Sequence, residues 1–150
     1  MNNKIKEQWL NAAKQVLSDR IKTAESAMKR AQEAAQGEEK SSAGDKYETA
    51  RAMSQLERDM NARQLDQALK ELAVLDKLDI NEKSVVMNGA AIKSDAQYYF
   101  IALGLGKIEF DGQNCIFLSP SSPIGAELMG KKAGDSITWN GQTIDLMEVF

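Results

Sequence analysis

The stretch LNAAKQVLSDRIKTAESAMKRA (Leu10–Ala31) decides the class of fold, because its apolar residues follow a helical repeat. Two series recur every seven residues and are offset by four: Leu10, Leu17, Ala24, Ala31 and Ile21, Met28, Ala35. This spacing is typical of one face of a helix that pairs with a second helix. The sequence therefore predicts a long helix over about 4–36.

A second helical pattern follows Gly44 and predicts a helix over about 45–78. Its apolar residues are expected to face the first helix: Met53, Leu56, Met60, Leu65, Leu69, Leu72 and Leu75. The polar stretch GEEKSSAG (Gly37–Gly44) between the two patterns predicts a turn, and short connections make neighbouring helices antiparallel. We therefore expect an antiparallel coiled-coil hairpin, whose tip comprises residues 37–48.

The frequency of Gly and Pro changes near residue 80. Residues 1–80 contain two of the ten glycines and no proline, whereas residues 81–150 hold the rest. Gly and Pro mark turns, so long elements give way to short ones. Segments rich in β-branched and aromatic residues predict strands in 84–92, 96–103 and 114–119. The fold class is therefore α+β, with a hairpin domain over 1–80 and a small antiparallel β-domain over 81–150.

Two local signals place a helix and a hairpin within 81–150. Ser122 suits a helix N-cap, Pro123 the first helical position, and Gly130 the residue after the helix. The dipeptide Asn140-Gly141 between two alternating stretches predicts a β-hairpin.

Composition narrows the possible functions. The chain lacks His, which removes His-based triads and helical His zinc motifs. Its single Cys cannot form an intramolecular disulfide or a multi-cysteine metal site. The net charge of −3 disfavours binding to free DNA. We see no signal peptide and no membrane-spanning run, and we expect a cytoplasmic monomer.

The acidic pair Asp45 and Glu48 stands at the predicted start of the second helix and has two interpretations. Asp45 as N-cap with Glu48 three residues later matches a capping box. The same spacing places both carboxylates on one side of the helix, where their oxygens suit a hard cation such as Mg²⁺. Two carboxylates would only complete a site whose other ligands lie elsewhere. The interpretations are compatible, because a cap can also be a ligand.

Two segments are similar to the GreA/GreB transcription elongation (transcript cleavage) factors, and the resemblance extends over nearly the whole chain. GDKYETA (Gly44–Ala50) is similar to the family's tip motif of Gly-Asp, two residues, then Glu-Asn-Ala. LSPSSPIGAELMGKKAGDSI (Leu118–Ile137) is similar to its longer Ser-Pro-hydrophobic-Gly segment. The resemblance implies a coiled-coil hairpin followed by an FKBP-like β-domain.

The resemblance also implies a mechanism. In the family the hairpin enters the secondary channel of bacterial RNA polymerase, and two tip acids help to hold Mg²⁺ and a water near the nascent RNA 3′ end. By position these acids are Asp45 and Glu48, and Mg²⁺ would be shared with the polymerase. The chain would stimulate the polymerase's own RNA cleavage and would not be an autonomous enzyme. The family segment that includes Ser122, Pro123, Ile124 and Gly125 belongs to the β-domain, which docks at the channel mouth.

Three departures from the family pattern keep alternatives open. Thr49 replaces the Asn after the acid, and Arg51 and Ala52 replace the usual Glu-Tyr. A regulator that enters the same channel without cleaving RNA is therefore a second hypothesis. A chaperone or adaptor whose hairpin grips clients is a third. It predicts exposed apolar residues along the distal arm, which from sequence alone is expected to be Ala-rich and charged.

Overall fold

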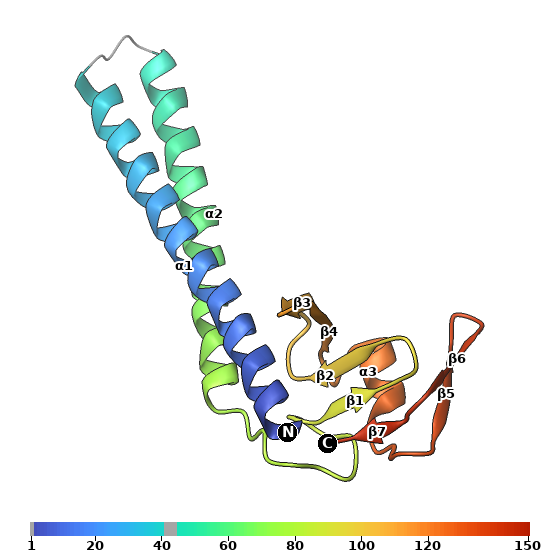
Figure 1. Cartoon of the computed structure of the whole chain (residues 1–150). Helices are drawn as coiled ribbons and strands as arrows, with labels where there is room; N and C mark the ends of the chain where they lie inside the picture. Colours follow the sequence, from blue (N-terminus) through green and yellow to red (C-terminus); the bar gives the residue numbers. More distant parts are fainter. Residues whose placement is uncertain (1, 41–44) are drawn as a thin grey trace. The chain divides into compact units, whose positions relative to one another are not determined.

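The structure is a computed structural model that describes the backbone of residues 2–40 and 45–150, and the side chains of these residues outside 35–47. It is α+β, as predicted: two long helices precede a mixed sheet, a short helix and a β-hairpin (Figure 1). The elements in chain order are α1 Asn2–Lys40, α2 Asp45–Asp76, β1 Ala91–Lys93, β2 Tyr98–Ile101, β3 Gly106–Phe110, β4 Gln113–Leu118, α3 Pro123–Leu128, β5 Ser136–Trp139, β6 Gln142–Asp145 and β7 Glu148–Val149.

The chain divides into two compact units. The boundary between them does not coincide with the change from helices to strands. The first unit, here the β-unit, comprises Met1–Gln15 and Val74–Phe150. The second, here the hairpin unit, comprises Val16–Ala73. The predicted boundary at residue 80 follows the change in composition, whereas the compact β-unit also takes in the first turns of α1.

In the hairpin unit α1 and α2 lie side by side and run antiparallel (Figure 1). The first series predicted for α1 is buried: Leu10, Leu17, Ala24 and Ala31 are each at most 6% exposed. The predicted helix end at residue 36 is wrong, because α1 continues through Gly37 to Lys40. One Gly costs a helix only about 1 kcal/mol, and the flanking residues Gln36, Glu38 and Glu39 are good helix formers.

The buried face of α2 agrees with the predicted one only in part: Leu75 is buried and Leu65 and Leu72 are half-buried as expected, but the other four predicted residues are exposed. Met53, Leu56, Met60 and Leu69 are 63%, 57%, 54% and 49% exposed. From Asn61 onward, a series of buried or half-buried positions steps by four and three residues: Asn61, Leu65, Ala68, Leu72 and Leu75. The facing positions of α1 narrow to alanine at Ala24 and Ala31, and small side chains let two helices approach closely. The contact with α1 therefore buries the small side chain of Ala68 rather than the largest apolar side chains of α2.

The main sheet of the β-unit is mixed, with strand order β3-β4-β2-β1-β7. The predicted wholly antiparallel sheet is wrong at one pair, because β2 and β4 are parallel, with Phe100 opposite Phe117. The chain reverses after β2 and again between β3 and β4. Two reversals restore the original direction, and β4 fills the place between β3 and β2.

The predicted strand over 84–92 is also wrong for most of its length. Only an isolated bridge from Val85 to Lys132 precedes β1, which begins at Ala91. The backbone turns at Gly89, whose φ is +86° and where a Cβ atom would lie 1.9 Å from the Asp79 carbonyl oxygen. Only glycine tolerates both conditions, so an apolar run is interrupted by a turn.

The short helix and the last hairpin confirm the local predictions. Ser122 caps α3, Pro123 begins it, and Gly130 follows it with φ +80°. Strands β5 and β6 pair antiparallel around Asn140 and Gly141, which both have positive φ (51° and 76°). This backbone conformation is that of the hairpin turn which Asn-Gly favours.

The core of the β-unit gathers residues from the sheet, α3 and the loops. Its buried apolar members include Val86, Ile92, Tyr99, Ile101, Leu128, Ile137 and Leu146. Cys115 on β4 is fully buried, and desolvation raises the pKa of its thiol. It is therefore a small core residue, as the sequence predicts for an apolar run.

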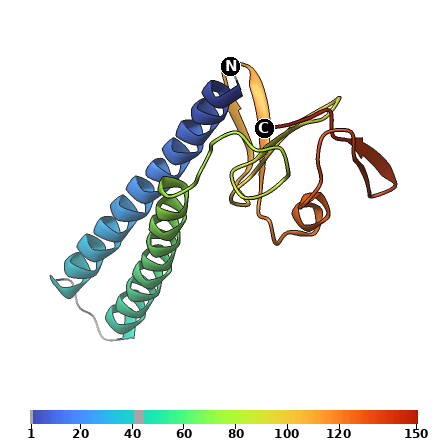
Figure 2. The ribbon, with the colours of Figure 1, turned by 90° about the horizontal axis from the view of Figure 1, so that it is seen from below.

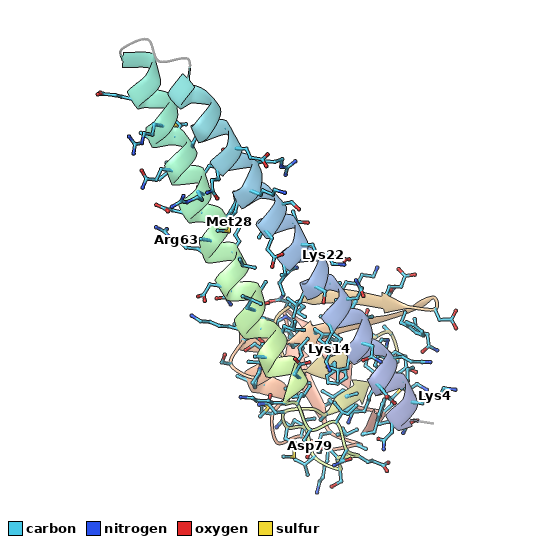
Figure 3. The ribbon with its side chains drawn as sticks, turned by 90° about the vertical axis from the view of Figure 1, so that its left-hand side faces the viewer. Lys4, Lys14, Lys22, Met28, Arg63 and Asp79 are labelled. Carbon is cyan, nitrogen blue, oxygen red and sulfur yellow. The ribbon has the colours of Figure 1, made fainter. Side chains whose placement is uncertain are left out.

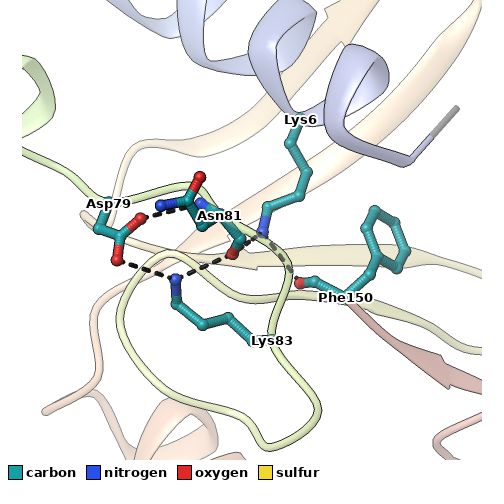
Figure 4. Close-up of polar contacts among 5 residues, drawn as sticks. All are labelled: Lys6, Asp79, Asn81, Lys83 and Phe150. Atoms are coloured by element: carbon teal, nitrogen blue, oxygen red, sulfur yellow. Dashed lines mark hydrogen bonds and ion pairs between the residues drawn. The ribbon is translucent and has the colours of Figure 1, made fainter.

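The first turns of α1 pack on the other side of the main sheet, where Tyr98 points away from the core members Tyr99 and Ile101 of the same strand. The Trp9 ring is buried and packs against the Tyr98 ring of β2, with centroids 5.0 Å apart. Lys6 is buried too, and its ammonium donates to the carbonyl oxygens of Asn81 (3.3 Å) and Phe150 (3.0 Å) (Figure 4). The two ends of the described chain consequently lie near one another (Figure 2).

A second lysine shares this site. Lys83 donates to the Asn81 carbonyl oxygen at 2.8 Å and forms an ion pair with Asp79 at 3.2 Å (Figure 4). Burial, and then repulsion from Lys83, lower the pKa of Lys6 to about 8, while Asp79 and Glu82 oppose the shift. The charged form of Lys6 is therefore disfavoured in the folded protein.

The lowered pKa of Lys6 predicts a pH-dependent stability. Between about 8 and 10.5 the unfolded chain holds a proton on Lys6 that the folded chain has released. The contribution of Lys6 to the free energy of unfolding should therefore rise with pH across this window. Denaturant unfolding of the wild type and of Lys6→Met should show a wild-type advantage that grows with pH.

The matched control for this experiment is Lys4→Met, since Lys4 lies on the same helix but is exposed. The stability difference between wild type and this control should stay flat over the same window. An equal slope for both variants would contradict the assignment to Lys6.

Candidate functional site at the start of helix α2

The predicted acidic pair lies at the beginning of α2. Asp45 is the first residue of that helix, and its side chain lies outside the described residues. Glu48, three residues later, is exposed. Residues three apart on a helix share a side, so the backbone puts the two positions on the same side of the first turn.

The neighbours of Glu48 on α2 modify its electrostatic surroundings. Arg51 is three residues further along the helix and is also exposed. Residue positions three apart share a side of a helix, so the positive charge of Arg51 offsets part of the negative charge of Glu48. Ala52, one turn after Glu48, adds no polar atom. The described part of this surface thus carries one carboxylate next to one guanidinium.

The donor set suits a hard cation but is small. Carboxylate oxygens are the ligands that Mg²⁺ prefers, and Mg²⁺ normally keeps several waters or takes ligands from a second molecule. Among the side chains that the structure describes, no three acidic or Cys residues cluster as metal ligands do. Glu48, with Asp45, could therefore contribute to a shared metal site and would need further ligands.

The four predicted partner-binding residues form the beginning of α3. The Ser122 hydroxyl accepts from the Gly125 N–H at 3.1 Å and donates to the Ser119 carbonyl at 2.7 Å. Pro123 is exposed, Ile124 is half-buried, and Gly125 is buried. A Cβ atom at Gly125 would lie 2.0 Å from the Ser119 oxygen, so glycine is required by the close approach of two backbone segments.

The rest of the longer family-like segment also has a local structural role. Leu128 is fully buried in the core. Gly130 and Gly134 have positive φ (80° and 93°), and the Asp135 carboxylate accepts from the Lys132 N–H at 2.9 Å. The motif thus encodes a capped helix followed by a tight turn, and Pro123 is one of its exposed members.

Sequence reasoning missed an apolar surface on α2, here called the α2 stripe: Met53, Leu56 and Met60. These side chains are more than half exposed. The residues were identified as apolar and periodic but were assigned to the contact with α1. In the sequence, the face of α2 that contacts α1 is marked by another series of positions, which lies on a different side of the helix from the stripe. This series is Asn61, Leu65, Ala68, Leu72 and Leu75.

A groove of ≈ 810 Å³ lies between the two helices of the hairpin unit. Ala24 of α1 and Ala68 of α2 line it, both only 4% exposed, and their small side chains leave the space open. Its α2 wall carries Arg63, Gln64 and Gln67. Figure 3 labels Arg63 on α2 and Met28 on α1.

Comparison of the chain with protein-family models, with curated proteins and with solved structures finds no match. In the described part of the chain, no helix is both long and apolar enough to cross a membrane.

The close approach of the Gly125 and Ser119 backbones leads to a testable prediction about α3. Gly125→Ala should lower the free energy of unfolding by about 2 kcal/mol or more, because the new methyl group must displace backbone at Ser119. The control is Gly104→Ala, where a Cβ atom would have no neighbour within 4 Å. Urea unfolding of both variants checks this, and similar losses at both sites would contradict it.

Proposed function

We propose that this chain is a Gre-like factor that binds bacterial RNA polymerase in the cytoplasm and stimulates cleavage of backtracked RNA. The hairpin would enter the secondary channel as an antiparallel coiled coil. The β-unit, proposed to be FKBP-like, would dock at the channel mouth. The observation that carries the proposal is the position of Asp45 and Glu48 on one side of the first turn of a long helix, at the end of a helical hairpin.

The hairpin supports this proposal by its form and its spacing. α1 and α2 are long, antiparallel and joined by a short connection. Buried residues on α1 follow the seven-residue spacing of a coiled coil, from Leu10 to Ala31. An arm of this kind presents the residues at its turn to a separate molecule.

The two acids would act within the polymerase centre. Asp45 and Glu48 would offer oxygen atoms toward the nascent RNA 3′ end and would orient a water by accepting its hydrogen bonds. Bound Mg²⁺ polarises phosphoryl oxygens and acidifies its water. In this proposal the other ligands and the reaction belong to the polymerase, and the chain would stimulate that reaction.

A channel regulator without cleavage activity is the second candidate. Arg51 favours it, because this exposed cation lies one turn from Glu48 and offsets its charge. Thr49 and Ala52 also depart from the family pattern. Such a regulator would bind polymerase and change initiation or pausing without shortening RNA.

A chaperone or adaptor is the third candidate. The expectation that the distal arm exposes no apolar surface is wrong, since Met53, Leu56 and Met60 are exposed. This observation removes the argument that disfavoured client binding. Suppression of aggregation of a model protein, lost in Met53→Glu, would favour this candidate.

The decisive test is cleavage of RNA in a backtracked polymerase complex. Wild-type chain should release short 3′ fragments in the presence of Mg²⁺, and Asp45→Asn with Glu48→Gln should reduce the rate by about 100-fold, as expected when a positioned group is lost from the reacting centre. Pull-down with polymerase should be unchanged in this double variant, because neither residue belongs to the β-unit.

Two outcomes would separate the candidates. Equal cleavage by wild type and the double variant would contradict the role of the two acids. Binding to polymerase without any shortening of RNA by wild type would favour the regulator. In that case Arg51→Glu, which restores the acidic residue of the family pattern, tests whether Arg51 blocks the activity.

A further inference from the structure

A pocket of ≈ 370 Å³ lies in the β-unit, between the β1–β2 connection, α3 and the β5–β6 hairpin. Its volume falls within the range of about 300–1,000 Å³ that is typical of ligand sites. Ile124 and Ile144 line it and also pack against the core of the β-unit. The pocket is therefore open space at the margin of the core.

Two aromatic side chains line this pocket from different elements. On β2, Tyr99 belongs to the core side of the sheet, whereas its neighbour Tyr98 lies on the other side. On β5, Trp139 follows the buried Ile137 by two residues, so both lie on the same side of the hairpin, but Trp139 is only half-buried. A ligand in the pocket would therefore contact aromatic surface.

The charge of the pocket is negative. Asp95 lines it, and none of the lining residues in the described part of the chain is basic. The Ser94 hydroxyl donates to the Gln97 carbonyl oxygen (2.8 Å) and accepts from the Gln97 N–H (3.0 Å), which holds the turn that carries Asp95. Lys93 pairs with Tyr98 and lines a separate pocket, so it lies on the opposite side of the sheet.

The aromatic and acidic walls together suit an organic cation. Burial, and then the negative charge of Asp95, raise the pKa of the Tyr99 hydroxyl, so the phenol stays neutral near neutral pH. The faces of aromatic rings attract cations, and a carboxylate adds to this attraction. A guanidinium fits better than an ammonium, because it is flat enough to stack on Trp139 and has several N–H donors. The side-chain amides of Asn140 and Gln142 offer further acceptors in the same pocket.

The strand beside the pocket has a free edge. β6 pairs with β5 in a two-stranded sheet, which no other strand of the described chain joins. Three successive residues of β6 line the pocket: Gln142, Thr143 and Ile144. Successive side chains of a strand point to opposite faces, so the pocket borders the edge of β6 as well as one face. An extended peptide can add to such an edge through main-chain hydrogen bonds and place alternate side chains in a pocket.

We propose that this pocket binds an arginine side chain of an extended peptide segment, which pairs with the free edge of β6. The guanidinium would stack on Trp139 and donate hydrogen bonds to the Asp95 carboxylate. Charge complementarity identifies the ligand as a cation, and the unpaired edge of β6 identifies its carrier as a polypeptide. The inference does not depend on polymerase binding, since it rests only on the β-unit.

Isothermal titration calorimetry of the full chain with the capped peptide Thr-Val-Arg-Val-Thr tests the ligand. This peptide should bind with a dissociation constant between micromolar and sub-millimolar. The same peptide with Gln in place of Arg should bind at least about tenfold more weakly, because it loses a cation–π contact and charge-assisted hydrogen bonds. Capped arginine alone should also bind more weakly than the peptide, because it lacks the main chain that pairs with β6.

Substitutions in the chain test the site. Asp95→Asn should weaken binding of the Arg peptide by at least about tenfold, because the amide keeps the shape of the side chain and removes its charge. Asp111→Asn is the matched control: Asp111 is exposed, lines the other pocket, and has a φ of 50° that Asn tolerates. This control should leave binding unchanged, whereas Trp139→Leu should weaken it.

Three results would overturn the proposal. The first is equal affinity for the Arg and Gln peptides, which includes the absence of binding by either. The second is an equal effect of Asp95→Asn and Asp111→Asn. The third is equal affinity for capped arginine and for the Arg peptide, which would remove the polypeptide as the carrier. Circular dichroism and thermal unfolding of each variant check that the β-unit stays folded.

Discussion

The buried side chain of Lys6 links the first turns of α1 to two other segments of the β-unit. Lys6 reaches from α1 to the carbonyl oxygens of Asn81 and Phe150, which belong to the segment after α2 and to the last strand region. Removing a charge from water is costly, and hydrogen bonds with carbonyl oxygens offset part of that cost. With the packing of Trp9 on Tyr98, this contact makes the first turns of α1 part of the β-unit. The compact units therefore do not coincide with the boundary between helices and strands.

The long helices could be predicted from sequence because their apolar residues repeat over many turns. Leu17, Ala24 and Ala31 are buried as the spacing predicts. The buried face of α2 could not be predicted as readily, because two sets of positions on that helix share the same period. Size of side chain favours Met53 and Met60, but the narrow contact with α1 uses Ala68 instead. Only the packing of both helices decides between them.

The sheet illustrates a second limit of sequence reasoning. Local signals that act through backbone conformation, such as Asn140-Gly141 and the Ser122 cap, were correctly predicted. The parallel pairing of β2 with β4 depends on contacts between distant segments, and no local signal specifies it. The apolar residues before Ala91 resemble a strand, yet the Asp79 carbonyl occupies the space beside Gly89 and forces a turn.

In the candidate site, too, features set by local backbone geometry could be predicted from sequence, whereas features set by the packing of the helices could not. The positions of Asp45 and Glu48 at the start of α2 follow from the helical periodicity that begins after Gly44 in the sequence. The Ser122–Gly125 segment is explained largely by its own folding, since its hydroxyl and its glycine satisfy backbone contacts at Ser119. A motif can thus be specific in sequence because its local geometry is demanding. The exposed face of α2 carries no such motif and became visible only when the helices were packed.

The isolation of Cys115 inside the sheet gives the protein a native reporter group. A thiol reacts as its thiolate, and burial both shields this sulfur and keeps it protonated. Alkylation therefore requires the surrounding strands to separate first. Since the sequence has no other cysteine, the labelling rate would measure the opening frequency of that region without any engineered probe.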